Sequence, residues 1–204
     1  MRRDAQLNRE KLIEAARTLF AERGLNVALE EVARRAGVSI GTLYNRFPSR
    51  EQLCVAVFAD RAEAVDRAVE QALATPDAWT GFVQFLERIC LLQAADRGFN
   101  DLAARGLPPV ALSKDPQSGY ENMVRLIARA QREGALREDF TPPDLAFVTW
   151  SITRTIEATA AVKPDLWRRH LALLCDGLRA EAAHPLPVPS LGQEELADLM
   201  QGKC

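Results

Sequence analysis

The sequence predicts an all-α protein that consists of an N-terminal helix-turn-helix domain and a larger helical body. Apolar residues recur at helical spacing along most of the chain, and no segment shows the apolar–polar alternation typical of a strand. Glycine and proline divide these stretches into about nine helices. The net charge also differs between the two parts of the chain. Residues 1–50 carry ten Lys and Arg against six Asp and Glu (+4), whereas residues 51–204 carry sixteen against twenty-two (−6).

The composition limits the class of protein. Of the 204 residues 48% are hydrophobic, which suffices for a core, and no apolar run reaches the roughly 18 residues of a membrane span. No signal peptide is apparent, and the four scattered cysteines form no CxxC pair. We therefore expect a cytoplasmic protein without a metal site or cofactor. The sequence has no Gly-rich phosphate loop, HExxH or GxSxG motif, which argues against an enzyme.

The first helix is expected over residues 8–23. Asn8 can cap its start and Gly24 can end it. Arg2 and Arg3 are expected to form an unstructured arm before it. The apolar stripe that this helix buries consists of Leu12, Ile13, Ala16, Leu19 and Phe20.

Two short helices joined by a tight turn follow. Residues 29–36 place apolar side chains on one helical face, and Gly37 then ends this helix. Ser39 can cap the next helix, in which Leu43 and Phe47 are spaced to share a buried face. The rest of that helix carries small polar, aromatic and basic residues. This arrangement is typical of a helix that reads the major groove of DNA.

This stretch resembles the DNA-binding segment of the TetR (tetracycline-repressor) family of bacterial transcription regulators. The residues that carry the resemblance are Ile13-Glu14-Ala15-Ala16, Leu19-Phe20, Gly24, Val32-Ala33, Ala36-Gly37-Val38-Ser39, Gly41, Leu43-Tyr44, Phe47, Arg50 and Leu53. One position departs from the family pattern, because Ala28 stands where a capping Thr or Ser is usual. The resemblance implies a ligand-responsive regulator, most often a repressor, that binds double-stranded operator DNA as a homodimer.

Several residues of the motif are candidates for phosphate contacts. The hydroxyl groups of Thr42 and Tyr44 can donate to phosphate oxygens, and the resemblance implies this role for Tyr44. A surface tyrosine packed on its neighbour is the alternative. Gly41 would let the DNA backbone approach closely. Arg50 lies at the start of the following helix, where the family usually has a phosphate-binding Lys.

Other residues of the same helix are candidates for reading bases. These are Ser39, Ile40, Thr42 and Asn45. An asparagine can pair with adenine through two hydrogen bonds, and an apolar side chain can meet a thymine methyl group. Arg46 suits either a phosphate or a guanine edge, and the sequence does not decide between them.

The body is expected to begin with a long fourth helix. It starts at an S-x-x-Q capping box at Ser49 and runs to about Leu73. Further helices are expected at residues 78–95, 100–105, 120–133, 141–161 and 164–183, with an irregular loop before residue 119. The candidate lining of a ligand pocket is Phe82, Leu86, Cys90, Phe99, Met123, Ile127, Trp150, Thr153 and Arg154. This mostly apolar set predicts a small hydrophobic or aromatic effector, although a plain core would look the same.

The last two long helices are apolar on more than one side. The resemblance implies that they form a four-helix bundle with a second subunit. The candidate interface residues are Leu145, Val148, Ile152, Ile156, Trp167, Leu171, Leu174 and Leu178. A twofold dimer would prefer a pseudo-palindromic operator. A thick core within one subunit is the alternative explanation of the pattern.

The domain limits follow from these assignments. We expect a DNA-binding domain at residues 6–64, with the motif at 28–47, and a ligand-binding and dimerisation domain at 65–184. A proline-rich tail at 185–204 could pack on the body, swap to a partner or stay disordered. Two other functions remain open at this point: a nonspecific DNA-binding protein, and a helical module that binds other proteins. The mild +4 charge of the N-terminal part disfavours the first.

Overall fold

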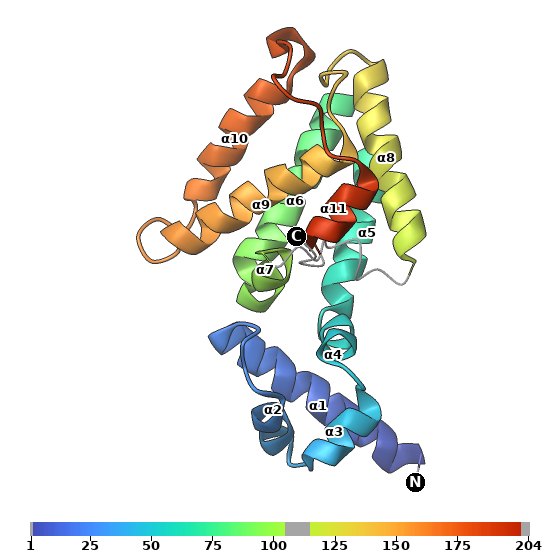
Figure 1. Ribbon diagram of the computed structural model, residues 1–204, viewed down its shortest axis with the longest axis vertical. Coiled ribbons are helices and arrows are strands. Elements are labelled where there is room, and N and C mark those ends of the chain that lie inside the picture. Colours follow the sequence, from blue (N-terminus) through green and yellow to red (C-terminus); the bar gives the residue numbers. More distant parts are fainter. Residues whose placement is uncertain (1, 105–114, 201–204) are drawn as a thin grey trace.

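The computed structural model describes residues 2–104 and 115–200, and this part of the chain forms helices joined by turns and loops, with no strand (Figure 1). The all-α fold class predicted from the sequence is confirmed. The helices are α1 (Arg2–Arg23), α2 (Leu29–Ala36), α3 (Ile40–Arg46), α4 (Arg50–Val57), α5 (Ala59–Ala74), α6 (Ala78–Ala95), α7 (Arg97–Ala104), α8 (Pro116–Arg132), α9 (Pro142–Thr159), α10 (Leu166–Leu178) and α11 (Gln193–Met200). None of the described helices is both long and apolar enough to cross a membrane.

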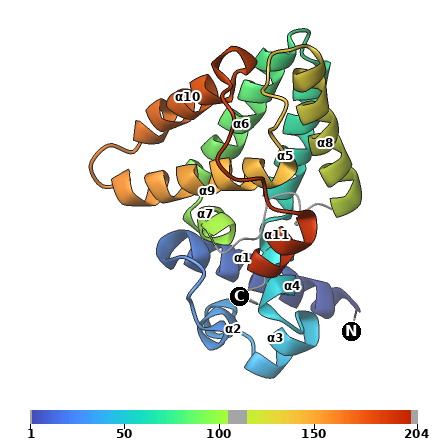
Figure 2. The same cartoon turned by 45° about the horizontal axis from the view of Figure 1, so that its top comes forward.

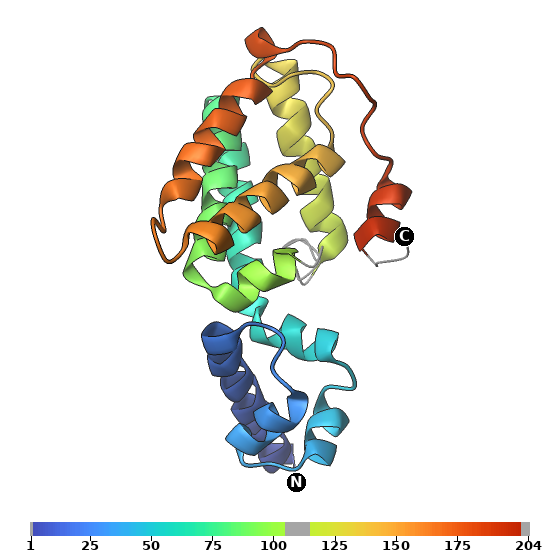
Figure 3. The same ribbon diagram turned by 60° about the vertical axis from the view of Figure 1, so that its left-hand side comes forward.

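The molecule has a smaller part, which we call the head (α1–α4), and a larger body (Figure 3). In the head, α1 packs against α2, α3 and α4. Leu12, Phe20, Val32 and Leu43 are fully buried there, so the predicted stripes meet in one small core. The head places α3 at the end of the molecule that is farthest from the body (Figure 2).

In the body, α5 and α6 pack closely side by side. Gly81 permits this approach, because a Cβ atom at this position would collide with the carbonyl oxygen of Ala72. Helices α8 and α9 pack against α6, and α10 packs against α9. Arg129 on α8 donates hydrogen bonds to the carbonyl oxygens of Leu73 (2.8 Å) and Pro76 (2.7 Å), which ties α8 to the turn between α5 and α6.

The predicted long fourth helix is wrong, because the chain forms two helices that meet at Phe58. Phe58 has φ −101° and ψ 13°, outside the helical range, and α4 and α5 run in different directions (Figure 3). The side chain of Phe58 is buried between the rings of Phe20 and Phe99, with centroids 6.2 and 5.9 Å away. We attribute the break to this long-range packing, since no glycine or proline marks it in the sequence.

Three helix starts also differ from the predictions. Helix α1 begins at Arg2 rather than at Asn8, because no helix-breaking residue lies between them. The prediction of an unstructured arm is therefore wrong. Helix α7 begins at Arg97, where the Asp96 carboxylate accepts the Phe99 amide hydrogen. Helix α8 begins at Pro116 within the expected loop, since the Asp115 side chain caps it. The rest of that loop lies largely outside the described residues.

The end of α10 is set by a contact with a distant turn. The predicted helix runs to residue 183, but α10 stops at Leu178 and a short 3-10 turn (Ala180–Ala182) follows. Arg179 is extended, and the flanking backbone pairs with the segment between α8 and α9. The Arg137 amide donates to the Leu178 carbonyl (3.0 Å), and the Ala180 amide to the Ala135 carbonyl (3.1 Å).

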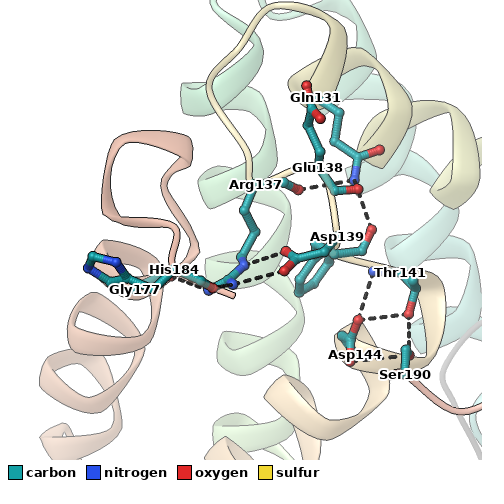
Figure 4. Close-up of polar contacts among 10 residues, drawn as sticks. Gln131, Arg137, Glu138, Asp139, Thr141, Asp144, Gly177, His184 and Ser190 are labelled. Atoms are coloured by element: carbon teal, nitrogen blue, oxygen red, sulfur yellow. Dashed lines mark hydrogen bonds and ion pairs between the residues drawn. The ribbon is translucent and has the colours of Figure 1, made fainter. Parts of the chain in front are cut away.

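The C-terminal segment ends in α11 (Figure 1). Figure 4 shows the polar contacts of Arg137 and Thr141 with His184 and Ser190 of this segment. Ser190 lies 2.6 Å from the Thr141 hydroxyl group, at the start of α9. Arg137 donates to the carbonyl oxygen of His184 (2.8 Å) and to the carboxylate of Asp139 (2.6 Å). The hydrogen bond between Arg137 and Asp139 holds the pKa of Arg137 above its usual range and the pKa of Asp139 below its usual range. Ser190 of the tail is thus held at the start of α9, whereas Leu186 and Val188 before it are 51% and 69% exposed.

Candidate nucleic-acid interface

The turn between α2 and α3 is held by hydrogen bonds that local sequence provides. Gly37 ends α2 with φ +70°, a left-handed conformation that glycine adopts readily, and its amide donates to the Arg34 carbonyl. Ser39 then caps α3, since its Oγ accepts the Thr42 amide hydrogen at 3.1 Å. The predicted helix end at Gly37 and the predicted cap at Ser39 are both confirmed. The start of α3 is therefore oriented by the turn as well as by the core below it.

Helix α3 separates its buried and exposed side chains sharply. Leu43 and Phe47 are 0% and 3% exposed and anchor the helix, whereas Tyr44 is 47% exposed. Asn45 and Arg46 are exposed beside Tyr44. Of the candidate DNA-binding residues, the exposed ones are Ser39, Gly41, Tyr44, Asn45 and Arg46, and the half-buried ones are Ile40, Thr42 and Arg50. The structure therefore gathers seven of the eight candidates on or beside α3.

Arg50 has a contact that the sequence did not suggest. Its Nη1 donates to the carbonyl oxygen of Leu25 at 2.8 Å, which links the start of α4 to the turn after α1. Ser49 caps α4 by accepting the Gln52 amide hydrogen at 3.3 Å. The Ser49 hydroxyl group also hydrogen-bonds the Glu51 carboxylate and keeps the pKa of Glu51 below its usual range. A guanidinium has five N–H groups, so Arg50 retains donors for a phosphate.

Most of the predicted ligand-pocket residues are buried. Phe82, for example, is 0% exposed and packs edge-on against the ring of Phe140, with centroids 5.8 Å apart. Burial raises the pKa of the Cys90 thiol to about 12. Buried as well are Leu86, Phe99, Met123, Ile127 and Thr153, whereas Trp150 is half-buried. Arg154 is exposed and pairs with Glu157 (2.6 Å), so it does not join the apolar group.

The choice of dimer residues requires a correction. The side chains of Leu145, Ile152, Ile156, Trp167 and Leu171 are at most 8% exposed within one subunit. They form the body core, because the face of α9 and α10 that carries them packs onto α6. Val148, Leu174 and Leu178 are half-buried. The exposed apolar side chains on these helices are instead Phe147 (39%) and Leu173 (59%), which the sequence pattern did not single out.

Two polar residues that the sequence analysis missed are buried where the head meets the body. Gln93 on α6 and Asn100 on α7 are 1% and 3% exposed. Gln93 follows Leu86 and Ile89 by seven and four residues, so a polar residue on an apolar helical face was the available signal. The described residues hold no group of three His, Cys, Asp or Glu side chains suited to a metal ion.

Two family models match the chain. One describes bacterial regulatory proteins of the tetR family and matches residues 12–57. The other describes the C-terminal domain of SbtR-like transcriptional regulators and matches residues 77–180, about half of the chain. An HTH-type transcriptional regulator of Staphylococcus aureus (strain USA300) is 40% identical over 55 residues, which are 26% of this chain and 30% of that relative's length.

Solved structures are similar to this protein over a larger part of the chain. A TetR transcriptional regulator of Streptomyces coelicolor is 30% identical, with 84% of this chain and 98% of that chain covered and a TM-score of 0.50. RolR, solved in complex with resorcinol, is 27% identical, with 93% and 100% covered and a TM-score of 0.57. These matches extend through both head and body. The chain therefore belongs to the TetR family of bacterial transcriptional regulators, which are not enzymes.

Proposed function

We propose that this protein is a homodimeric transcriptional repressor that binds a pseudo-palindromic operator through α3 and is released by a small-molecule effector. One observation carries the DNA-binding part of this proposal. Helix α3 is anchored by Leu43 and Phe47 and capped by Ser39, while Tyr44, Asn45 and Arg46 are exposed together. A short helix with a fixed orientation and an exposed polar face suits the major groove.

The exposed residues divide into two proposed roles. Tyr44 would donate its hydroxyl hydrogen to a phosphate, which sets the position of the protein on DNA without reading sequence. Asn45 would pair with a base edge, and Ile40 would meet a thymine methyl group. The hydroxyl groups of Ser39 and Thr42 already share one hydrogen bond (2.9 Å), so each has fewer donor and acceptor positions left to bind a base. Arg46 remains assigned to either a phosphate or a guanine.

Gly41 supports a close approach of DNA to α3. A Cβ atom added at Gly41 would find its nearest neighbour, Ser39 Oγ, at 3.8 Å, which is an ordinary contact distance. Packing within the protein therefore does not require glycine at this exposed helical position, and glycine costs helix stability relative to alanine. A requirement for close contact with the DNA backbone would explain the residue.

Release by an effector would follow from differential binding. A molecule that fits the body in only one arrangement of the two heads lowers operator affinity by its preference for that arrangement. The related RolR was solved with resorcinol, a small aromatic molecule, which supports a hydrophobic or aromatic effector here. An effector-bound form with full operator affinity would contradict this part of the proposal.

Selection of binding sites from random duplex DNA tests the central claim. We expect a pseudo-palindromic consensus. Tyr44→Phe should then weaken binding to all sequences alike, by about tenfold, whereas Asn45→Ala should change preference at one base position per half-site. If the protein retains DNA but selects no preferred sequence, a nonspecific DNA-binding protein would be favoured. No enrichment even at low salt would favour a protein-interaction module.

A further inference from the structure

A cleft of about 740 Å³ lies where the head meets the body. Arg23 and Asn26 line it from the head, at the end of α1 and in the turn that follows. The ends of α6 and α9, together with α7, line it from the body. Figures 1 and 3 show α7 beside this end of α1. The cleft is large enough for a small organic molecule.

Two amide side chains in this cleft carry buried atoms without a hydrogen-bond partner in the described part of the chain. Both Oε1 and Nε2 of Gln93 are buried and unpaired, although Gln93 is only 1% exposed. Asn100 is 3% exposed, and its Oδ1 is likewise unpaired, while its Nδ2 donates to the Glu157 carboxylate at 3.4 Å. Buried polar groups in folded proteins are normally paired, so these atoms point to a bound molecule that both donates and accepts hydrogen bonds.

The charged residues of the cleft favour an anion. Three arginines and two carboxylates line it. Arg23 pairs with Glu31 (2.8 Å), and Arg154 pairs with Glu157 (2.6 Å). Arg97 is exposed at the start of α7 and forms no ion pair with the described part of the chain. Its guanidinium is therefore available to a carboxylate.

The remaining wall is apolar. Small hydrophobic surfaces are provided by Ile156 on α9, by Ala160 directly after α9, and by Ala94 at the end of α6. We propose that this cleft binds an amphipathic organic acid. Its ring or chain lies on Ile156, its carboxylate pairs with Arg97, and a hydroxyl or amide group at its other end hydrogen-bonds Gln93 and Asn100.

The cleft is connected to the DNA-binding elements through Leu25. Asp101 on α7 accepts the Leu25 amide hydrogen at 3.0 Å, while Arg50 of α4 donates to the carbonyl oxygen of the same residue at 2.8 Å. A ligand in the cleft contacts both α1 and α7. It can therefore shift the segments that the two hydrogen bonds of Leu25 join to α4. The consequence for operator binding rests on the proposed function, whereas ligand binding does not.

Ligand binding can be tested by calorimetry and thermal unfolding without DNA, using 4-hydroxycinnamate and 4-hydroxybenzoate as probes. Their methyl esters lack the negative charge, and cinnamate and benzoate lack the hydroxyl group. We expect the hydroxy acids to bind at least about tenfold more tightly than either set of controls. Arg97→Gln should lose this preference for the acid over the ester. Arg132→Gln, which changes an exposed arginine of α8, should keep it.

Gln93→Leu separates a ligand contact from a structural role. The substitution removes unpaired polar atoms from a buried site, so the melting temperature of the free protein should rise by about 3 °C while binding of the hydroxy acids is lost. Two results would overturn the proposal: acids that bind no better than their esters, or a Gln93→Leu protein that still binds them. The selection of operator sites contains no acid, so a failure of the proposed DNA-binding function would appear in that experiment. A failure of the proposed ligand site would appear in the calorimetry and thermal unfolding instead.

Discussion

Two glycines show how single residues are assigned to the fold or to a partner. At Gly98, on α7, an added Cβ atom would lie 2.9 Å from Phe58 Cζ and 3.0 Å from Phe20 Cβ. The fold requires glycine there, because α7 must approach α1 closely. At Gly41 the nearest atom would be 3.8 Å away, so the fold alone accepts a side chain. The same residue type thus has two different reasons to be present.

We therefore expect opposite results from two alanine substitutions. Gly98→Ala should lower the free energy of unfolding by about 1–3 kcal/mol, because it overpacks a buried contact. Gly41→Ala should raise it by up to about 1 kcal/mol and yet weaken operator binding. Urea unfolding and gel-shift titration measure the two quantities. Equal operator affinity for Gly41→Ala and the unchanged protein would remove the argument for close DNA contact.

Buried thiols give a second prediction at the residue scale. Burial raises the pKa of Cys90 to about 12 and that of Cys175 to about 11. At pH 8 the reactive thiolate is then about 10⁻⁴ of Cys90 and about 10⁻³ of Cys175. We expect neither to react with iodoacetamide within minutes in the folded protein, and both to react after unfolding in urea, as peptide mass spectrometry would measure. Rapid labelling of the folded protein would indicate that the body opens.

Helix starts differ in how well they are capped. Ser39 caps α3, and Asp77 caps α6 by accepting the Thr80 amide hydrogen at 2.7 Å. Hydrogen bonds from the side chain and the amide of Thr80 keep the pKa of Asp77 below its usual range. Helix α2 is preceded by Ala28, whose backbone has the extended conformation of a cap but whose side chain accepts no hydrogen bond. The departure from the family pattern therefore leaves the Ala28 position before α2 without a side-chain hydrogen bond.

The caps predict a matched pair of stability changes. Ala28→Ser should raise the free energy of unfolding by about 0.5–2 kcal/mol, since the backbone already has the required conformation. Ser39→Ala should lower it by about 1 kcal/mol and also weaken operator binding, because it loosens the start of α3. Chemical denaturation followed by circular dichroism measures both. If Ala28→Ser lowered stability, the assigned cap geometry of α2 would be wrong.

The whole molecule joins a head that carries α3 to a body whose α9 and α10 lie along one side (Figure 1). The inner face of these two helices packs within the subunit. In the proposed homodimer the partner would therefore bind their outer surfaces. Phe147 and Leu173 are exposed there, and Phe147 packs edge-on against Trp150 with ring centroids 5.3 Å apart. Exposed aromatic and aliphatic side chains on neighbouring helices are typical of an oligomer interface.

Charge placed on this surface should separate the proposed dimer. We expect Phe147→Glu combined with Leu173→Glu to halve the mass measured by light scattering, and to weaken operator binding by about a hundredfold because the two heads no longer bind together. Leu186→Glu is the control, since Leu186 is similarly exposed (51%) but lies in the tail. An unchanged mass for the double variant would place the interface elsewhere.

The sequence by itself determined the features that depend on neighbouring residues. Helical periodicity predicted the all-α fold, Gly37 and Ser39 predicted the turn before α3, and the spacing of Leu43 and Phe47 predicted its buried face. These signals are local, because a helix and its caps depend on residues within about one turn. The family resemblance came from the same short stretch.

Only the tertiary structure decided which surface each helix buries and where long helices break. The break at Phe58 results from packing against α1 and α7, and α10 ends where its backbone meets the α8–α9 segment. Helices α9 and α10 are apolar on several sides, so periodicity alone did not distinguish core from interface. The cleft with Gln93 and Asn100 is formed by residues far apart in the chain. Such features depend on contacts between distant segments, which local patterns do not encode.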